Sequence, residues 1–423
     1  MLRVKVKYIW LIFCISLVFW KPALAETDTL RIDFKGAERL FLENNLRLIA
    51  QKYHVEASKA MVKQAKLWDN PTLNTEQNLY DNTHQLFNHS NGNGEFYAVI
   101  SQVFKTAGKR GKQIQMARND ASIQEAAFND LMRNLRYNLF LDLGELAKLN
   151  DQNELFRMGI SSLTDLVGAT EKLYKAGNMS LRDEVRLKAL LFSQESDLAE
   201  NQSQANTLQS ELQTLLGVSE HTVLMPLIPI VHKENLPALD SLIAIAKRNR
   251  GDYQISELQL VQARTNLNYQ KSLRIPDVTA GIVYDRINSY APHYFGLQLG
   301  IPIPLFDRNQ GNIKAAQLSL KGQESELSGS EAELRSSVAA AVRQYELCRT
   351  MLSESSEEFY QKYNQLFNSM LKSYQQRQIS LIEFTDFFDS YRETRLKILE
   401  QQYNFQKSIA TLNYSVGATV VNP

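Results

Sequence analysis

The sequence predicts a mainly α-helical fold made of two similar halves, each of which carries one β-hairpin. Two observations predict it. Long stretches of helix-forming residues contain no proline, at 110–176 and again at 312–376. Short segments between the helical stretches alternate apolar and polar residues with a period of two, at 72–104 and 277–303. This alternation is typical of strands with one apolar face.

The first 25 residues have the pattern of a secretory signal peptide. Three basic residues precede an apolar run from Tyr8 to Trp20, and small residues follow, up to Ala25. Four of the 47 basic residues lie in this segment, so 43 basic and 46 acidic residues remain. A chain so close to neutral is not expected to offer a broad surface to nucleic acid. Cys348 is the only cysteine after the segment, which excludes a disulfide within the chain.

The first half is expected to run through a helix, a hairpin and two more helices. The first helix covers Phe34–Leu67, and the proline that follows ends it. The strands Thr72–Asp81 and Glu95–Phe104 flank a polar loop rich in Asn, Gly and His. A helix of about 65 residues comes next, and it would extend about 100 Å. A shorter helix then ends at Leu216.

The second half repeats this order. Helices are expected over Asp240–Leu273, over 312–376 and over Ser380–Asn413, with the second hairpin after the first of them. The segment KLYKAGNMSLRDEV at Lys172 matches KSYQQRQISLIEFT at Lys372 with a shift of 200 residues, which indicates a duplication. The chain is thus divided into residues 1–25 (signal peptide), 26–217 (first repeat), 218–237 (connector, equatorial region) and 238–423 (second repeat).

The hairpins cannot complete a fold within one chain. No stretch of 18 apolar residues follows the signal peptide, so no transmembrane helix is expected, and any membrane-embedded part would be a β-barrel. Such a barrel needs about eight strands or more, whereas one chain supplies two hairpins. We therefore expect several chains to pool their strands in a symmetric oligomer.

The segments that follow the two hairpins carry a family resemblance. SQVFKTAGKRGKQIQMA and GIPIPLFDRNQGNIKAA resemble the outer membrane factor family of efflux ducts, the TolC-like proteins, and most of all its heavy-metal branch, the CzcC- and CusC-like proteins. The resemblance implies a homotrimer in the cell outer membrane that extends into the periplasm. It would contain a 12-stranded transmembrane β-barrel joined to a 12-helix periplasmic α-barrel. An inner membrane transporter of the resistance-nodulation-division type, reached through a periplasmic adaptor (membrane fusion protein), is the implied partner.

Two polar turns are the first candidate site. SLRD at Ser180 and SLIE at Ser380 fit a capping box, in which the serine and the acidic residue bind each other's amide groups. The resemblance implies instead a periplasmic gate formed by Glu383 and Asp386, with Asp183 as the matching acid of the first half. Residues three apart share one helix face, so three chains would form two acidic rings that favour cations. Capping and gating both remain open.

The resemblance also implies a latch of polar residues that holds the gate closed. Tyr374, Arg377 and Arg182 stand at the places expected for such a latch. The family pattern has glycine at the position of Gly177, whereas the second half has Arg377 there. This departure leaves the details of the latch open, and ordinary solvated helix ends are the alternative.

A second candidate site consists of the corners at which strands give way to helices. Proline lacks the amide hydrogen that a sheet needs, and glycine allows the sharp turn. The corner residues are Pro71, Pro276, Pro302, Pro304, Gly108 and Gly311. The basic segment around Gly108 lacks the spacing of a phosphate-binding loop, because Val103 stands where the first glycine of that motif would be.

The sequence contains no constellation of acid, base and nucleophile that would indicate an enzyme, so no catalytic residue, cofactor or metal ligand is expected. Histidines of the hairpin loops, His84, His89 and His293, are read as solvated. Passive export is the leading hypothesis, with heavy-metal cations as cargo. A duct for drugs or secreted proteins is the alternative within the class, and a periplasmic coiled-coil adaptor or scaffold is the alternative from another class.

Overall fold

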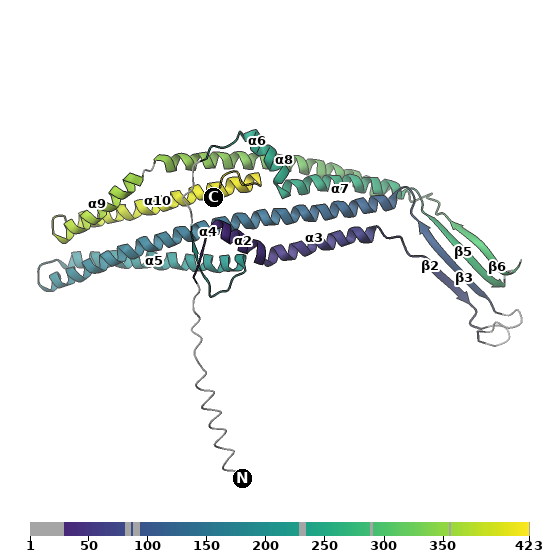
Figure 1. The fold of residues 1–423 in the computed structure, drawn as a ribbon, viewed down its shortest axis with the longest axis horizontal. Helices are drawn as coiled ribbons and strands as arrows, with labels where there is room; N and C mark the ends of the chain where they lie inside the picture. Colours follow the sequence, from purple (N-terminus) through teal and green to yellow (C-terminus); the bar gives the residue numbers. More distant parts are fainter. Residues whose placement is uncertain are drawn as a thin grey trace, which may run out of the picture. The chain divides into compact units, whose positions relative to one another are not determined.

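The computed structural model describes residues 29–80, 86–87, 94–227, 234–287, 291–354 and 357–422. The expected signal peptide and the histidines of the first hairpin loop lie outside these ranges. Within them the chain forms six strands and nine helices (Figure 1). These are β1 (Thr29–Ile32), α2 (Phe34–Asn44), α3 (Leu46–Ala65), β2 (Thr72–Gln77), β3 (Phe96–Phe104), α4 (Lys109–Lys175), α5 (Leu181–Leu216), β4 (Val223–Pro226), α6 (Leu239–Asn249), α7 (Gly251–Leu273), β5 (Val278–Ile287), β6 (Pro292–Gly300), α8 (Gln310–Glu354), α9 (Glu357–Gln375) and α10 (Leu381–Val416).

The chain divides into two compact units, and the long helices α4 and α10 contribute to both. Unit 1 takes its residues from Met1–Asn45, Leu139–Ile230 and Tyr360–Tyr403, and unit 2 from Leu46–Asn138, Val231–Phe359 and Asn404–Pro423. The expected mainly helical character is confirmed, and so is the first long helix, since α4 has 67 residues without interruption.

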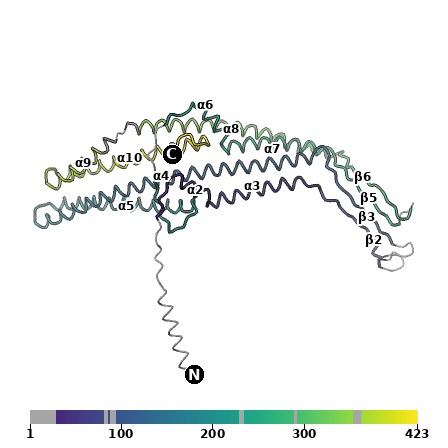
Figure 2. The backbone as a smooth tube through the Cα atoms, in the orientation of Figure 1, coloured from purple at the N-terminus to yellow at the C-terminus, as the bar shows by residue number. Residues whose placement is uncertain are grey.

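Unit 1 contains two helical hairpins, α4 with α5 and α9 with α10. Figure 2 shows the chain reversing at the turn between the helices of each hairpin. Leu163, Leu187, Phe384 and Phe388 form the centre of a buried cluster that draws on both hairpins. A short parallel pair, β1 with β4, also belongs to this unit. The sequence analysis missed both strands, because four residues are too few to show a period of two.

Unit 2 contains the four-stranded sheet in the order β2-β3-β5-β6, in which every neighbouring pair is antiparallel. The two expected hairpins therefore join through β3 and β5 (Figure 1). A second buried cluster, with Leu242, Tyr345 and Phe405 among its members, packs parts of α6, α8 and α10 together. The hydroxyl of Tyr345 donates a hydrogen bond to the carbonyl of Glu234 (2.9 Å), which ties the connector to this cluster.

The prediction of one helix over Phe34–Leu67 is wrong, because the chain breaks at Asn45. This residue is extended (ψ 111°) and almost fully buried, and its side-chain amide donates through Nδ2 to the carbonyl of Leu215 (2.9 Å). Gly217 lies directly against Asn44, so close that a Cβ on the glycine would stand 2.8 Å from the Asn44 side chain. A tertiary contact with the end of α5 therefore sets the break.

The prediction of one helix over Asp240–Leu273 is wrong for the same reason. Arg250 is extended (ψ 117°), and its guanidinium binds Ser337, Asp252 and the carbonyl of Ser415. Gly417 packs against the backbone of Arg250, as Gly217 packs against Asn44. Both halves thus break their first helix where it meets the end of their last one.

Two further boundaries differ from the expectation. Two strands are shorter than expected: β2 ends at Gln77 instead of Asp81, and β6 ends at Gly300 instead of residue 303. Pro302 follows two residues after the end of β6, and a proline has no amide hydrogen to extend the ladder. The second long helix is described as α8 and α9, with residues 355–356 between them outside the described ranges.

Candidate functional site: the helical tips and the sheet corners

The two turns that close the helical hairpins, at residues 176–180 and 376–380, have the same backbone. In each turn, a backbone amide donates to the carbonyl five residues earlier. The donor and acceptor are Asn178 and Leu173 in the first turn, and Gln378 and Ser373 in the second. Gly177 has φ 75°, and Arg377 takes the same left-handed conformation with φ 58°. The duplicated sequence thus folds into a duplicated turn, although only one copy has the glycine that this conformation favours.

The serine caps differ between the two turns. The amide of Glu383 donates to the Ser380 hydroxyl (3.2 Å), and the amide of Ser380 donates to the Glu383 carboxylate (2.7 Å), which completes a capping box. The bond from the Ser380 amide is the largest cause that lowers the pKa of the Glu383 carboxyl, since it stabilises the charged form. At Ser180 the Asp183 amide donates to the hydroxyl (3.2 Å), and the Asp183 carboxylate lies 3.7 Å from Arg182 instead.

The gate candidates of α10 lie on its exposed face. Glu383 and Asp386 are exposed, whereas Leu381, Phe384 and Phe388 between and beyond them are buried in the cluster of unit 1. Asp389 continues the exposed acidic row at the same spacing of three. The arrangement presents carboxylates along one helix face, which the i, i+3 spacing predicted. A gate role for these residues stays a prediction.

Three candidates come together at a cavity of about 410 Å³ between the two tip turns of unit 1. Asp183, Tyr374 and Arg377 line it, together with Ser180 and Leu166. The ring of Tyr374 stacks on Phe384 at 5.0 Å. Burial raises the pKa of the Tyr374 hydroxyl, and the charge of Asp183 raises it further. Arg182, Glu383 and Asp386 do not line this cavity.

The corner before α4 contains an interaction that the sequence analysis missed. The ammonium of Lys109, whose side chain is 5% exposed, lies 2.6 Å from the Asp277 carboxylate and donates to the carbonyl of Ile275 (2.6 Å). The amide of Thr106 donates to the same carboxylate (2.8 Å), and its hydroxyl donates to the carbonyl of Pro276 (2.6 Å). No sequence signal joins residues about 170 positions apart, so only the fold reveals this contact.

The other corner residues stand at the ends of strands. Pro71 directly precedes β2, and Pro276 lies two residues before β5. Gly108 has φ 67°, which explains the glycine. At the second corner Asn309 takes the left-handed conformation (φ 57°), and its side chain donates to the carbonyl of Gln270 (2.8 Å). Gly311 has open space around it and no left-handed φ, so backbone geometry does not require glycine there.

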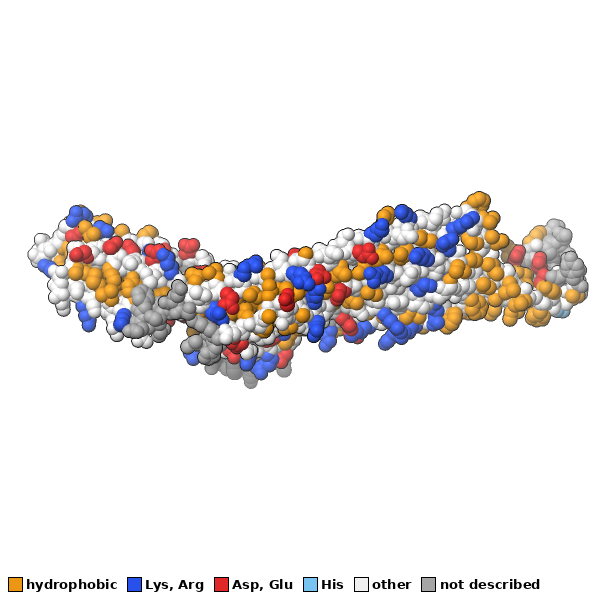
Figure 3. All heavy atoms as spheres, turned by 90° about the horizontal axis from the view of Figure 1, so that it is seen from above, with side chains coloured by type: hydrophobic (Ala, Val, Ile, Leu, Met, Phe, Trp, Pro, Cys, Tyr) orange, Lys and Arg blue, Asp and Glu red, His pale blue; other side chains and the backbone are white. Residues whose placement is uncertain are grey.

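The sheet exposes a continuous apolar row on one face. The register pairs Leu73 with Ile100, Ile100 with Ile282, and Ile282 with Leu297, and these four side chains are 52–75% exposed. Figure 3 shows hydrophobic side chains gathered over the end of unit 2 that carries the strands. The sheet thus brings the apolar faces of its separate strands together in one surface. Unpartnered apolar surface of this extent indicates contact with lipid or another apolar partner.

None of the described helices is both long and apolar enough to cross a membrane. Within the described ranges, His, Cys, Asp and Glu side chains form no group of three that could hold a metal ion. The imidazole of His293 lies 2.9 Å from the hydroxyl of Tyr284, within hydrogen-bond distance.

In each half, a strand hairpin with an exposed apolar face precedes a helical hairpin. This duplicated arrangement defines a channel-type outer membrane protein. The chain belongs to the outer membrane efflux protein family, whose model matches residues 39–218 and 242–418. Members of this family are transport ducts and not enzymes. The protein is an outer membrane efflux channel that extends into the periplasm, as the sequence resemblance implied.

Individual relatives support this assignment. The chain is 20% identical to the cobalt-zinc-cadmium resistance protein CzcC of Cupriavidus metallidurans over 374 residues, which cover 87% of this chain and 86% of CzcC. Its fold is similar to that of CusC, with a TM-score of 0.74, 19% identity and 95% of each chain covered. The outer membrane protein VceC of Vibrio cholerae gives a TM-score of 0.75 at 16% identity, with 91% of this chain and 96% of VceC covered.

Proposed function

We propose that this protein is the exit duct of a tripartite efflux pump for heavy-metal cations. Three chains would form a 12-stranded barrel in the outer membrane and a 12-helix tunnel in the periplasm. A periplasmic adaptor and an inner membrane transporter of the resistance-nodulation-division type would complete the pump. The four segments expected from the sequence belong to this proposal, with the connector at the equator of the tunnel.

The open sheet supports the trimer. β2 and β6 are its outer strands, and within the described residues each pairs with a neighbour on one side alone. Unpaired backbone groups at both edges of an apolar sheet are costly in lipid, so membrane insertion requires the edges to pair with other chains. Four strands from each of three chains give twelve, which is enough to close a barrel.

Metal cations are favoured as cargo by the relative and by the charge of the tip. The curated relative CzcC is a cobalt-zinc-cadmium resistance protein. The exposed carboxylates of Glu383 and Asp386 would line the narrow end of the tunnel in the trimer, where negative charge attracts cations and repels anions. Tyr374 and Arg377, which meet the gate candidate Asp183 at one cavity, are proposed as the latch together with Arg182, whose guanidinium lies 3.7 Å from the Asp183 carboxylate.

Two measurements test the proposal. The purified chain in a non-ionic detergent should have the mass of three copies. Deletion of its gene should reduce growth in cobalt, zinc and cadmium salts, while growth in a panel of apolar drugs stays unchanged. Reintroduced wild-type protein should restore growth.

Other outcomes would contradict parts of the proposal. Sensitivity to the drugs alone would point to a drug-efflux duct. A protein that is soluble and monomeric without detergent would instead be a periplasmic adaptor or scaffold, and both the trimer and the duct would be excluded.

A further inference from the structure

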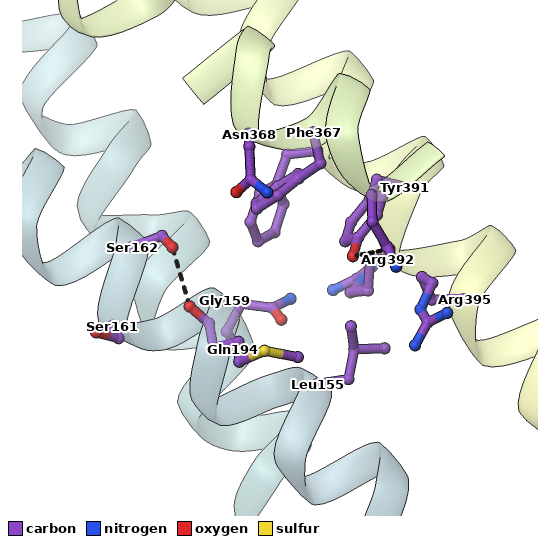
Figure 4. Close-up of a pocket in the computed structure, with 13 residues that line it drawn as sticks. Leu155, Gly159, Ser161, Ser162, Gln194, Phe367, Asn368, Tyr391, Arg392 and Arg395 are labelled. Atoms are coloured by element: carbon purple, nitrogen blue, oxygen red, sulfur yellow. Dashed lines mark hydrogen bonds between the residues drawn. The ribbon is translucent and has the colours of Figure 1, made fainter. Parts of the chain in front are cut away.

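Unit 1 contains a second cavity, distinct from the cavity between the tip turns. All four helices of the two helical hairpins contribute to it: α4 through Leu155, α5 through Gln194, α9 through Phe367, and α10 through Arg392 and Arg395 (Figure 4). Its volume is about 490 Å³, within the range of sites that hold small organic molecules. None of its lining residues belongs to the proposed gate or latch.

Three nitrogen atoms at this cavity are buried donors without an acceptor. They are Nε of Arg392, Nε of Arg395 and Nε2 of Gln194, which have no hydrogen-bond partner in the part of the chain that the structure describes. Gln194 is 1% exposed. Figure 4 shows the three side chains around one space, from two different helices. Buried donors left unpaired cost free energy, and a bound acceptor removes that cost.

Two polar side chains of the lining are already engaged within the chain. The Asn364 carbonyl oxygen accepts from the hydroxyl of Tyr391 (2.8 Å), and the Ser162 hydroxyl donates to the carbonyl of Met158 (3.0 Å). The two guanidinium groups carry hydrogen-bond donors and no acceptor. They therefore favour a ligand that brings oxygen acceptors.

The two charged side chains that line the cavity, Arg392 and Arg395, are both cationic. Arg392 is paired, with Asp197 at 3.1 Å and Asp389 at 3.8 Å. Arg395 has no ion-pair partner among the residues that the structure describes, and Asp151 interacts with it at longer range. Phe367, Phe388 and Met158 also line the cavity and supply apolar surface to it.

We propose that this cavity binds a small organic monoanion that has a carboxylate and an aromatic or similarly bulky apolar body. The carboxylate accepts hydrogen bonds from Arg395, Arg392 and Gln194, and the apolar body lies against Phe367 and Phe388. A bidentate guanidinium contact is the strongest recognition that a carboxylate finds in proteins. Because the expected cargo is cationic, this site is not a station on its path, and a bound anion would instead bridge all four helices of unit 1.

Calorimetry on the full chain, purified in a non-ionic maltoside, tests the proposal with 4-phenylbutyrate as the probe. Saturable binding is expected, with one site per chain. The neutral analogue 4-phenylbutanamide should bind at least tenfold more weakly, because it lacks the charge. Acetate should also bind at least tenfold more weakly, because it lacks the apolar body. Equal binding of the neutral analogue, or no binding of 4-phenylbutyrate, would overturn the proposal.

Variants locate the site. Arg395→Gln should weaken binding at least tenfold, and Lys397→Gln, which removes an exposed cation two residues away that pairs with Glu393 (2.6 Å), should leave it unchanged. Met158→Trp fills the cavity from a half-exposed position without altering charge, and it should weaken binding even if Arg395→Gln fails to fold. Binding that survives Met158→Trp, or that Lys397→Gln weakens as much as Arg395→Gln does, would place the anion elsewhere. The binding test does not measure metal resistance, so its failure can be distinguished from a failure of the proposed function.

Discussion

At the scale of single residues, Asp142 makes the stability of unit 1 depend on pH. Burial in α4 raises the pKa of Asp142 to about 6, and the charges of Glu211 and Glu145 add to the effect. In the unfolded chain the pKa of an aspartate is about 3.9. The carboxyl is therefore protonated in the folded state over a range where the unfolded state is ionised. Its contribution to stability is present below about pH 4 and is lost as the pH rises through 6.

Asp142→Asn should remove this loss. At pH 8 we expect the variant to be more stable than the wild type by about 1 to 3 kcal/mol, and at pH 4 the two should be equal. Thermal unfolding followed by circular dichroism at both pH values measures the difference. Asp165→Asn, at an exposed position of the same helix, is the control and should keep the pH dependence of the wild type. A variant less stable than the wild type at pH 8 would contradict the assignment.

Lys109 is the second residue with a large expected effect. Its ammonium is buried with Asp277, so Lys109→Met leaves an unpaired carboxylate at the corner. We expect a loss of about 2 to 4 kcal/mol in unfolding free energy, and partial recovery in the double variant with Asp277→Asn. Lys105→Met breaks an exposed ion pair with Asp69 (3.1 Å) at the same corner and should cost about 1 kcal/mol or less. Equal losses from Lys109→Met and Lys105→Met in thermal unfolding would exclude the buried-pair explanation.

At the scale of elements, the duplicated tip turns allow a matched comparison. Arg377 holds a left-handed φ that costs a non-glycine residue about 1 kcal/mol. Arg377→Gly should therefore stabilise the turn by about that amount, and Gly177→Ala should destabilise its counterpart by a similar amount. Strain of this kind is tolerated where a side chain has a role. If Arg377 belongs to the proposed latch, Arg377→Gly should raise single-channel conductance while it raises stability. A variant that is more stable but unchanged in conductance would separate Arg377 from the latch.

The apolar face of the sheet predicts that added charge has different effects on the two faces of β6. Leu297 and Leu299 are 75% and 65% exposed, and Gln298 points to the opposite face. Leu297→Glu should prevent assembly in the outer membrane, because a carboxylate on the lipid face costs several kcal/mol. Gln298→Glu adds the same charge on the other face and should assemble normally. Fractionation of membranes, followed by detection of the trimer, compares the two. Equal assembly would mean that the lipid-facing side has been assigned wrongly.

The elements that the sequence predicted well are those whose signal is local. α4 has a proline-free run, and β3, β5 and β6 show period-two alternation, so both kinds of element are confirmed. The breaks at Asn45 and Arg250 were missed, because contacts with the ends of α5 and α10 cause them and no residue nearby announces them. The Lys109–Asp277 pair and the donor-rich cavity at Arg395 were missed for the same reason. Both depend on side chains that only the tertiary fold brings together.

At the scale of the whole molecule, the backbone follows the duplication that the sequence match indicated. The turns at Gly177 and Arg377 and the glycines Gly217 and Gly417 keep the shift of 200 residues, and all four residues have positive φ. The family match likewise covers two separate segments, one in each half. Two halves that repeat in this way would present similar helical hairpins around a threefold axis, which is how three chains could form a ring of twelve helices.

The proposed trimer makes the acidic face of α10 a test of ion selectivity. Single carboxylates on an exposed helix have little influence in bulk solvent, but three copies around a narrow pore would act together. Glu383 also completes a capping box, so its replacement by alanine would disturb the turn itself. Glu383→Gln retains a side chain that can cap the turn, and Asp386→Asn removes the second charge without a change in size.

The double variant Glu383→Gln with Asp386→Asn should raise conductance and weaken the preference for cations. The reversal potential in a potassium chloride gradient across a planar bilayer measures this preference. The effect should be largest at low salt, because about 0.1 M salt already screens exposed charges beyond about 10 Å. Glu393→Gln removes an exposed carboxylate seven residues after Asp386 on α10 and should leave selectivity unchanged. An unaltered reversal potential in the double variant would show that these carboxylates do not line the pore, although the duct itself could still stand.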